Sequence, residues 1–187
     1  MLRRLKDYFA NKRILKAIDN NQRNGFVNLS QVKSLCLIIN AEEYDLGKGL
    51  DNLLALIKSD IPSVNNLDII AYTALKEKNF TPRILEFQKR KNAYLLQNKH
   101  FGFSYSLRHP KLKEVLVQKK FDAMIVFNKS NHLGIKRLVS EIVSEFNVGY
   151  HSNENIEVFD FMMKSDLKIH SFGKEILRYL KLIDDKS

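Results

Sequence analysis

The stretch that most constrains the fold of this 187-residue chain runs from residue 121 to residue 150. It begins with a short apolar run, FDAMIVF, which is typical of a strand buried on both faces. A polar loop, NKSNH, leads into LGIKRLVSEIVSEF, whose apolar residues recur at helical spacing. The stretch closes with NVGY, a second short strand candidate. Strand, helix and strand form a βαβ unit, whose strands are parallel and whose crossover is almost always right-handed.

The helix expected in this unit has one apolar stripe and one polar face. We expect the stripe to pack against the sheet, so that Ile142 and Val143 lie in the core. The stripe consists of Ile135, Leu138, Val139, Ile142, Val143 and Phe146.

A second βαβ unit precedes the first. The apolar run SLCLII at 34–39 predicts a buried strand, and the leucine stripe of residues 43–59 predicts a helix. The run DIIAY at 68–72 predicts the next strand. The single cysteine, Cys36, lies in the first of these runs, so we expect a small buried core residue and no intramolecular disulfide.

The remaining segments continue the alternation of strands and helices. Residues 83–96 are ambiguous. Thr81 and Pro82 are typical of a helix start and would allow a helix over this range. The alternation of strands and helices instead requires a strand at 93–97, and we favour this strand. This pattern predicts an α/β fold, three-layer and Rossmann-like, with a mostly parallel sheet of about five strands and flanking helices. The later expected elements are a helix at 111–119, a strand at 158–163 and a helix from residue 171.

Residues 1–24 are predicted to form a basic amphipathic helical arm that precedes a single α/β domain at 25–187. We expect its apolar residues, among them Leu5, Phe9 and Ile14, to keep to one side. Docking on the chain's own domain is the simplest of three alternatives. The others are an anionic membrane surface and a groove of RNA.

Two short segments carry the whole positive excess of a chain whose formal net charge is +10. Residues 1–24 and residues 76–100 each hold seven basic side chains against two acidic ones, a net charge of +5 for each segment. Such asymmetry favours a polyanionic partner, although a basic protein without one is equally compatible. No apolar stretch approaches the roughly 18 residues of a membrane span, and no secretory signal is visible, so we expect a cytoplasmic location.

Motifs of enzymatic chemistry are scarce. The seven glycines form neither G-x-G-x-x-G nor a Walker loop, and the five histidines lack metal-ligand spacing. No cofactor, metal or catalytic residue is therefore predicted, and we favour a non-catalytic protein while leaving an enzyme open.

One polar loop deserves consideration as a ligand site, because ligands of open α/β sheets bind at the carboxyl ends of the strands. Asn128, Ser130, Asn131 and His132 follow the central strand and could bind a small nucleotide-type ligand. The alternative, which we favour, is that Asn128 to Asn131 only cap the next helix. We interpret Asp122, at the start of the strand, as structural or solvated.

Basic and aromatic residues interleave in a way typical of RNA-binding surfaces, in which cations bind phosphates and aromatics stack on unpaired bases. Tyr94 lies among the basic residues of the second segment, and Phe101, Phe103 and Tyr105 follow directly after Lys99 and His100. The candidate RNA contacts are Arg3, Arg4, Lys6, Lys12, Arg13, Lys16, Lys89, Arg90, Lys91 and Lys99.

The segments NKHFGFSY, FDAMIVFN, FNVGY and FDFMM, with the final helix ending in LRYLKLI, resemble a family of small uncharacterised bacterial proteins, known only as a domain of unknown function. That resemblance implies an α/β domain in a bacterial cytoplasm and no particular activity. The stretch at 121–150 has a weaker, generic likeness to the Rossmann-like N-terminal half of sugar-nucleotide glycosyltransferases.

The sequence thus favours a non-catalytic binding protein that associates with structured RNA or a ribonucleoprotein, in the manner of a ribosome-associated subunit. A small transferase-like enzyme and a peripheral membrane protein remain as alternatives. The oligomeric state is left open.

Overall fold

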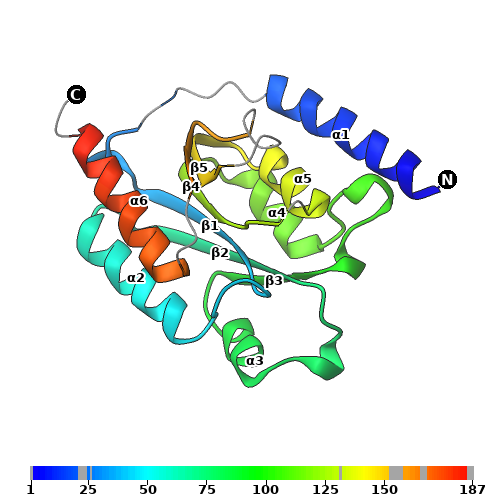
Figure 1. Cartoon of the computed structure of the whole chain (residues 1–187), viewed down its shortest axis with the longest axis horizontal. Coiled ribbons are helices and arrows are strands. Elements are labelled where there is room, and N and C mark those ends of the chain that lie inside the picture. The colour runs from blue at the N-terminus through cyan, green and yellow to red at the C-terminus, as the bar shows by residue number, and fades with distance from the viewer. Residues whose placement is uncertain are drawn as a thin grey trace.

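The computed structural model describes residues 2–20, 25, 27–130, 132–151, 158–164 and 168–184. Its centre is a sheet in the order β3-β2-β1-β4-β5-β6, and every pairing between these strands is parallel (Figure 1). The predicted fold class is confirmed, with six strands in place of about five. The strands are β1 (Ser34–Asn40), β2 (Asn66–Thr73), β3 (Ala93–Gln97), β4 (Phe121–Phe127), β5 (Ser144–Tyr150) and β6 (Phe161–Met163).

Helices cover both faces of the sheet, which makes three layers (Figure 1). One face carries α2 (Lys48–Asp60), α3 (Pro82–Gln88) and α6 (Ile169–Asp184). The other face carries α4 (Pro110–Gln118) and α5 (Leu133–Glu141). Four short 3₁₀ turns lie in the connections, namely η1 (Leu29–Gln31), η2 (Glu77–Asn79), η3 (Asn98–His100) and η4 (Phe103–Tyr105).

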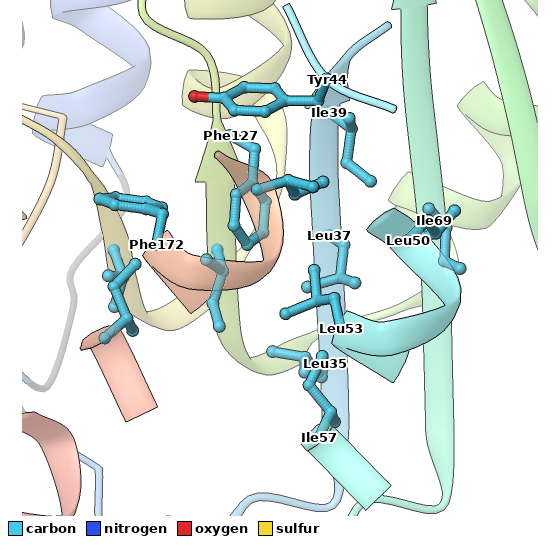
Figure 2. Close-up of a cluster of buried hydrophobic side chains, with 14 of the residues drawn as sticks. Leu35, Leu37, Ile39, Tyr44, Leu50, Leu53, Ile57, Ile69, Phe127 and Phe172 are labelled. Carbon is cyan, nitrogen blue, oxygen red and sulfur yellow. The ribbon is translucent and has the colours of Figure 1, made fainter. Parts of the chain in front are cut away.

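Alternation along β1 divides the core into two clusters, because successive side chains of a strand point to opposite faces. Leu35, Leu37 and Ile39 pack against the leucine stripe of α2 (Figure 2). Cys36 and Ile38 face α4 and α5. The predicted burial of Cys36 is confirmed, and that burial raises the pKa of its thiol well above the ordinary value.

The N-terminal arm forms helix α1 (Leu2–Asn20), which docks on the domain beside α5 and η4 (Figure 1). Ala10 and Ile14 are buried in this contact. The prediction of one apolar side was wrong, because Leu5 and Phe9 are exposed on the opposite side of the helix. Their positions in the helical repeat differ from that of Ile14 by about half a turn, so one contact surface cannot bury all three.

The expected helix after β4 is shorter than predicted. It ends at Glu141, and residues from Ser144 onward pair with β4 as strand β5. Ile142 is buried as expected, whereas Val143 is exposed, so that part of the prediction was wrong. The reason is strand pairing. The Val143 carbonyl accepts the Phe121 N–H at 2.9 Å, which an intact helix through this point would not allow.

Other boundaries also differ from expectation, since β6 begins at Phe161 rather than at residue 158. Helix α2 starts at Lys48 rather than near residue 43, since residues 41–47 form a turn. The strand preferred at 93–97 is confirmed and the helix alternative over 83–96 is wrong, because α3 ends at Gln88 and Asn92 has a left-handed φ of 56°.

Candidate functional site

The strand order places a topological switch point between β1 and β4. The chain leaves β1 toward β2 on one side and β4 toward β5 on the other, so the two connecting loops diverge at the carboxyl edge. Ligands of doubly wound α/β proteins bind in the crevice at this point. The loops that meet here follow Asn40 and Asn128, and the second loop is the one predicted from the sequence as a possible ligand site.

The polar groups at this edge bind one another. The Asn40 side-chain amide lies 3.1 Å from Asn128 Oδ1 and 3.2 Å from Ser130 Oγ, and Ser130 Oγ donates to Asn128 Oδ1 at 2.8 Å. The Glu43 carboxylate accepts the backbone N–H groups of Lys129 at 2.6 Å and Ser130 at 2.8 Å. Asn131 lies outside the described residues.

A second carboxylate occupies the start of α2. Asp45 accepts the N–H groups of Gly47 at 2.9 Å and Gly49 at 3.1 Å, and Arg83 donates to it at 2.8 Å. The hydrogen bond from Gly47 leads the contributions that hold the pKa of Asp45 below its usual value. Backbone amides of this kind are what a phosphate would need, and here the chain's own carboxylates already bind them.

His132, rather than an asparagine, caps the helix after β4. Its Nδ1 accepts the Ile135 N–H at 3.3 Å. The centre of its ring lies 4.2 Å from the ring centre of Tyr72 and 6.2 Å from that of Tyr105. Burial lowers the pKa of His132 and raises that of Tyr72 to about 12. Burial thus favours the neutral ring, which is the form whose Nδ1 can accept the Ile135 N–H.

Asp122 was interpreted as structural or solvated, and its contacts are structural. Its Oδ2 accepts the N–H groups of Lys33 and Ser34, each at 2.8 Å, and so fixes the entry into β1. Burial alone would raise the pKa of Asp122, but these hydrogen bonds bring it below the ordinary value.

A hollow of about 520 Å³ lies between the β1–α2 loop and the start of α3. Glu42, Thr81 and Arg83 contribute to its walls, and the ion pair between Arg83 and Asp45 spans one side. Within the ranges that the structure describes, no cluster of His, Cys, Asp or Glu could hold a metal ion.

The first predicted basic segment is displayed on the outer face of α1. Arg4, Lys12, Arg13 and Lys16 are exposed. Arg13 donates to Ser104 Oγ at 2.9 Å, and the Lys6 ammonium lies 4.1 Å from the centre of the Tyr105 ring. The side chain of Arg3 lies outside the described part.

The second predicted basic segment lies elsewhere. Lys89 and Lys91 are exposed in the turn after α3, at the end of the molecule away from α1 (Figure 1). Arg90 pairs with Asp51 at 2.6 Å, and Lys99 pairs with Glu77. The structure therefore separates the two segments, and it pairs two of the four candidate RNA contacts of the second segment with carboxylates.

Sequence reasoning missed two residues of the α1 surface. Tyr8 is 60% exposed and Leu15 is 48% exposed, and both lie among the basic residues. The sequence did contain a sign of this arrangement, because Tyr8 lies one helical turn from both Arg4 and Lys12. Phe103, one of the aromatics predicted to stack on bases, is 53% exposed and lies against Phe9.

The sheet order is that of dinucleotide-binding Rossmann domains, and the molecule is a Rossmann-like α/β protein with an added N-terminal helix. A family model described as "Family of unknown function (DUF6913)" matches residues 6–183. The chain belongs to this family, which confirms the resemblance seen in the sequence. No curated protein and no solved structure gives a significant match, so the likeness to glycosyltransferases is not shown.

Proposed function

We propose that this protein binds RNA through the outer face of α1, as a non-catalytic component of a ribonucleoprotein in the cytoplasm. One observation carries the proposal. Helix α1 docks on α5, which fixes its orientation. Arg4, Lys12 and Lys16 are consequently exposed to solvent on the same helix as exposed aromatic side chains. Fixed cations bind phosphates and release their counterions without first having to be ordered.

The cations of α1 differ from those of the second basic segment in their availability. Across the ranges that the structure describes, Arg4, Lys12 and Lys16 form no ion pair, whereas Arg90 and Lys99 are each engaged by a carboxylate. A cation already paired must lose its carboxylate before it binds a phosphate. The surface of α1 is therefore the better polyanion site.

The arrangement of apolar residues on α1 favours RNA over a membrane. A helix that lies in a bilayer surface separates a wholly apolar face from a charged one. Two of the exposed apolar residues of α1, Tyr8 and Leu15, share their sector with Lys12, so that insertion would carry an ammonium group into the acyl region. None of the described helices is long and apolar enough to cross a membrane.

The contacts at the switch point weigh against a nucleotide-dependent transferase. A phosphate near Ser130 would have to displace the Glu43 carboxylate, and one at the start of α2 would have to displace Asp45. Each displacement would set two anions close together.

A salt titration against bulk cellular RNA tests the proposal. The double substitution Lys12→Gln/Lys16→Gln should weaken binding and make the slope of log affinity on log salt shallower by roughly 1.4–1.8, since each phosphate contact contributes roughly 0.7–0.9. Lys89→Gln/Lys91→Gln is the matched control, because it removes the same charge from the distant exposed turn. Equal losses in the two variants would show that binding follows net charge and would refute a site on α1.

A further inference from the structure

Three exposed aromatic rings form a continuous surface at the junction of α1 and η4. Phe103 is 53% exposed, and its ring centre lies 6.4 Å from that of Phe9, which is 40% exposed. Tyr8 is 60% exposed, and its ring centre lies 5.6 Å from that of Phe9. We call these three residues the aromatic platform. They come from segments that lie far apart in the sequence and meet only in the fold.

The chain adopts an unusual backbone to display Phe103. Ser104 and Tyr105, which follow it, both have a left-handed φ, of 59° and 57°. Residues other than glycine occupy this region at an energetic cost, and such strain gathers at functional sites. Gly102 precedes the turn, and a Cβ there would lie only 2.5 Å from Arg108 Nε, so the Arg108 side chain would have to move to make room for it.

Contacts from α1 hold this strained loop in place. Arg13 donates to Ser104 Oγ at 2.9 Å, and the Lys6 ammonium lies over the Tyr105 ring. The backbone also closes on itself, with the Gly102 N–H donating to the Ser106 carbonyl at 2.8 Å. Phe103 is therefore fixed outside the core beside Phe9, although burial of such a ring would be the favourable outcome.

Cations surround the platform on α1. Arg4 and Lys12 each lie one helical turn from Tyr8, and Arg13 lies one turn from Phe9. Alternation of exposed rings and cations matches a single strand of nucleic acid, whose bases stack on aromatic faces while its phosphates bind basic groups. A double helix hides its base faces inside the stack and could use only the cations.

We infer that the aromatic platform stacks on unpaired bases, so that the RNA bound by this surface is single-stranded. This inference rests on the proposed function and specifies its substrate class. A helix-rich RNA would then bind through its loops or ends rather than through its duplex regions.

The absence of tryptophan from the chain provides a direct probe of stacking. Phe103→Trp keeps an aromatic ring on the platform and introduces the only indole of the protein. Its fluorescence should be quenched when a single-stranded 12-mer oligouridylate binds. An oligomer of the same length without bases at its central positions should bind more weakly and quench less, although its phosphates are unchanged.

Alanine substitutions measure the contribution of the rings to affinity. Phe103→Ala and Phe9→Ala should each weaken binding of the intact 12-mer by about tenfold, equivalent to roughly 1.4 kcal/mol, with an unchanged salt slope. Tyr179→Ala is the matched control, since Tyr179 on α6 is likewise 40% exposed beside an arginine, Arg178, on another face. The affinity of the Tyr179→Ala variant for the 12-mer should equal that of the unsubstituted protein. The melting temperature of each variant shows that it is folded.

The possible failures are distinguishable. If Lys12→Gln/Lys16→Gln weakens binding but both phenylalanine variants bind as well as the unsubstituted chain, the proposed function stands and stacking is refuted. Equal affinity for a 12-base-pair duplex would also refute stacking. No binding of any RNA refutes both proposals. Phenylalanine-dependent binding to vesicles containing anionic phospholipid, without binding to oligouridylate, would identify a membrane surface in place of RNA.

Discussion

Lys119 Nζ lies 2.6 Å from Asp68 Oδ2, and the Asp68 side chain is only 1% exposed. Asp68 belongs to β2 and points into the cluster that contains Cys36, while Lys119 is the C-cap that follows α4 on the same face of the sheet. An ion pair thus joins the second strand to the helix that leads into the fourth. The other oxygen of Asp68 has no hydrogen-bond partner in the described structure. The ion pair with Lys119 is therefore what stabilises this buried negative charge.

Lys119→Met should therefore destabilise the protein by about 3 kcal/mol, because it leaves a buried carboxylate without its cation. The lower end of the usual range applies, since the Lys119 side chain is 40% exposed and water can reach the site. Urea unfolding measures the effect. Asp68→Asn combined with Lys119→Met should recover part of the loss. A double variant less stable than Lys119→Met would contradict the assignment.

Glu43→Gln should cost about 1–2 kcal/mol, because a neutral amide cannot replace both charge-assisted hydrogen bonds to the amides of Lys129 and Ser130. The control is Glu86→Gln, at an exposed position on α3, which should change the unfolding free energy by less than about 0.5 kcal/mol. Thermal and urea unfolding report both variants. Equal stability of the two would show that Glu43 does not bridge the loops in solution.

Ile14→Ala tests whether α1 is docked. Ile14 is 6% exposed against α5, so truncation should lower the unfolding free energy by about 2 kcal/mol. The adjacent Leu15 is 48% exposed, and Leu15→Ala should have an effect within about 0.5 kcal/mol. If neither substitution matters, the helix does not dock and the fixed surface on which RNA binding depends does not exist.

Local sequence patterns predicted the order of strands and helices and misplaced the boundary between α5 and β5. Residues 142–146 carry apolar side chains that fit a helix at Ile142 and Val143 and also a strand at Phe146. Pairing with β4 decides between them, and that partner is remote in the sequence. Ile142→Ala should consequently cost roughly 2–5 kcal/mol, whereas Val143→Ala, at a 40% exposed position, should cost less than about 1 kcal/mol. Equal costs for the two substitutions would support the longer helix predicted from the sequence.

The candidate sites likewise combine features that local sequence patterns reveal with contacts that only the fold creates. The basic character of α1 was readable from residues close together in the sequence. The contact of Glu43 with Lys129 was not, since the two are 86 residues apart and only the strand order joins them. Phe103 meets Phe9 for the same reason, and no periodicity connects a loop residue to a helix outside its own segment.

Acid should destabilise the protein through three histidines that act as hydrogen-bond acceptors. Nδ1 of His100, His109 and His132 accepts the N–H of Gln97, Leu112 and Ile135, respectively. Burial lowers the pKa of each below the ordinary value of about 6.5, so the unfolded chain binds these protons more readily than the folded one. Their stabilising effect is complete above pH 6.5 and is lost as pH falls toward the lowered values. His109→Asn keeps a good helix cap without a titratable group, so its melting temperature should fall less steeply between pH 7.5 and 5 than that of the unsubstituted protein. Parallel curves would mean that His109 does not contribute to the acid sensitivity.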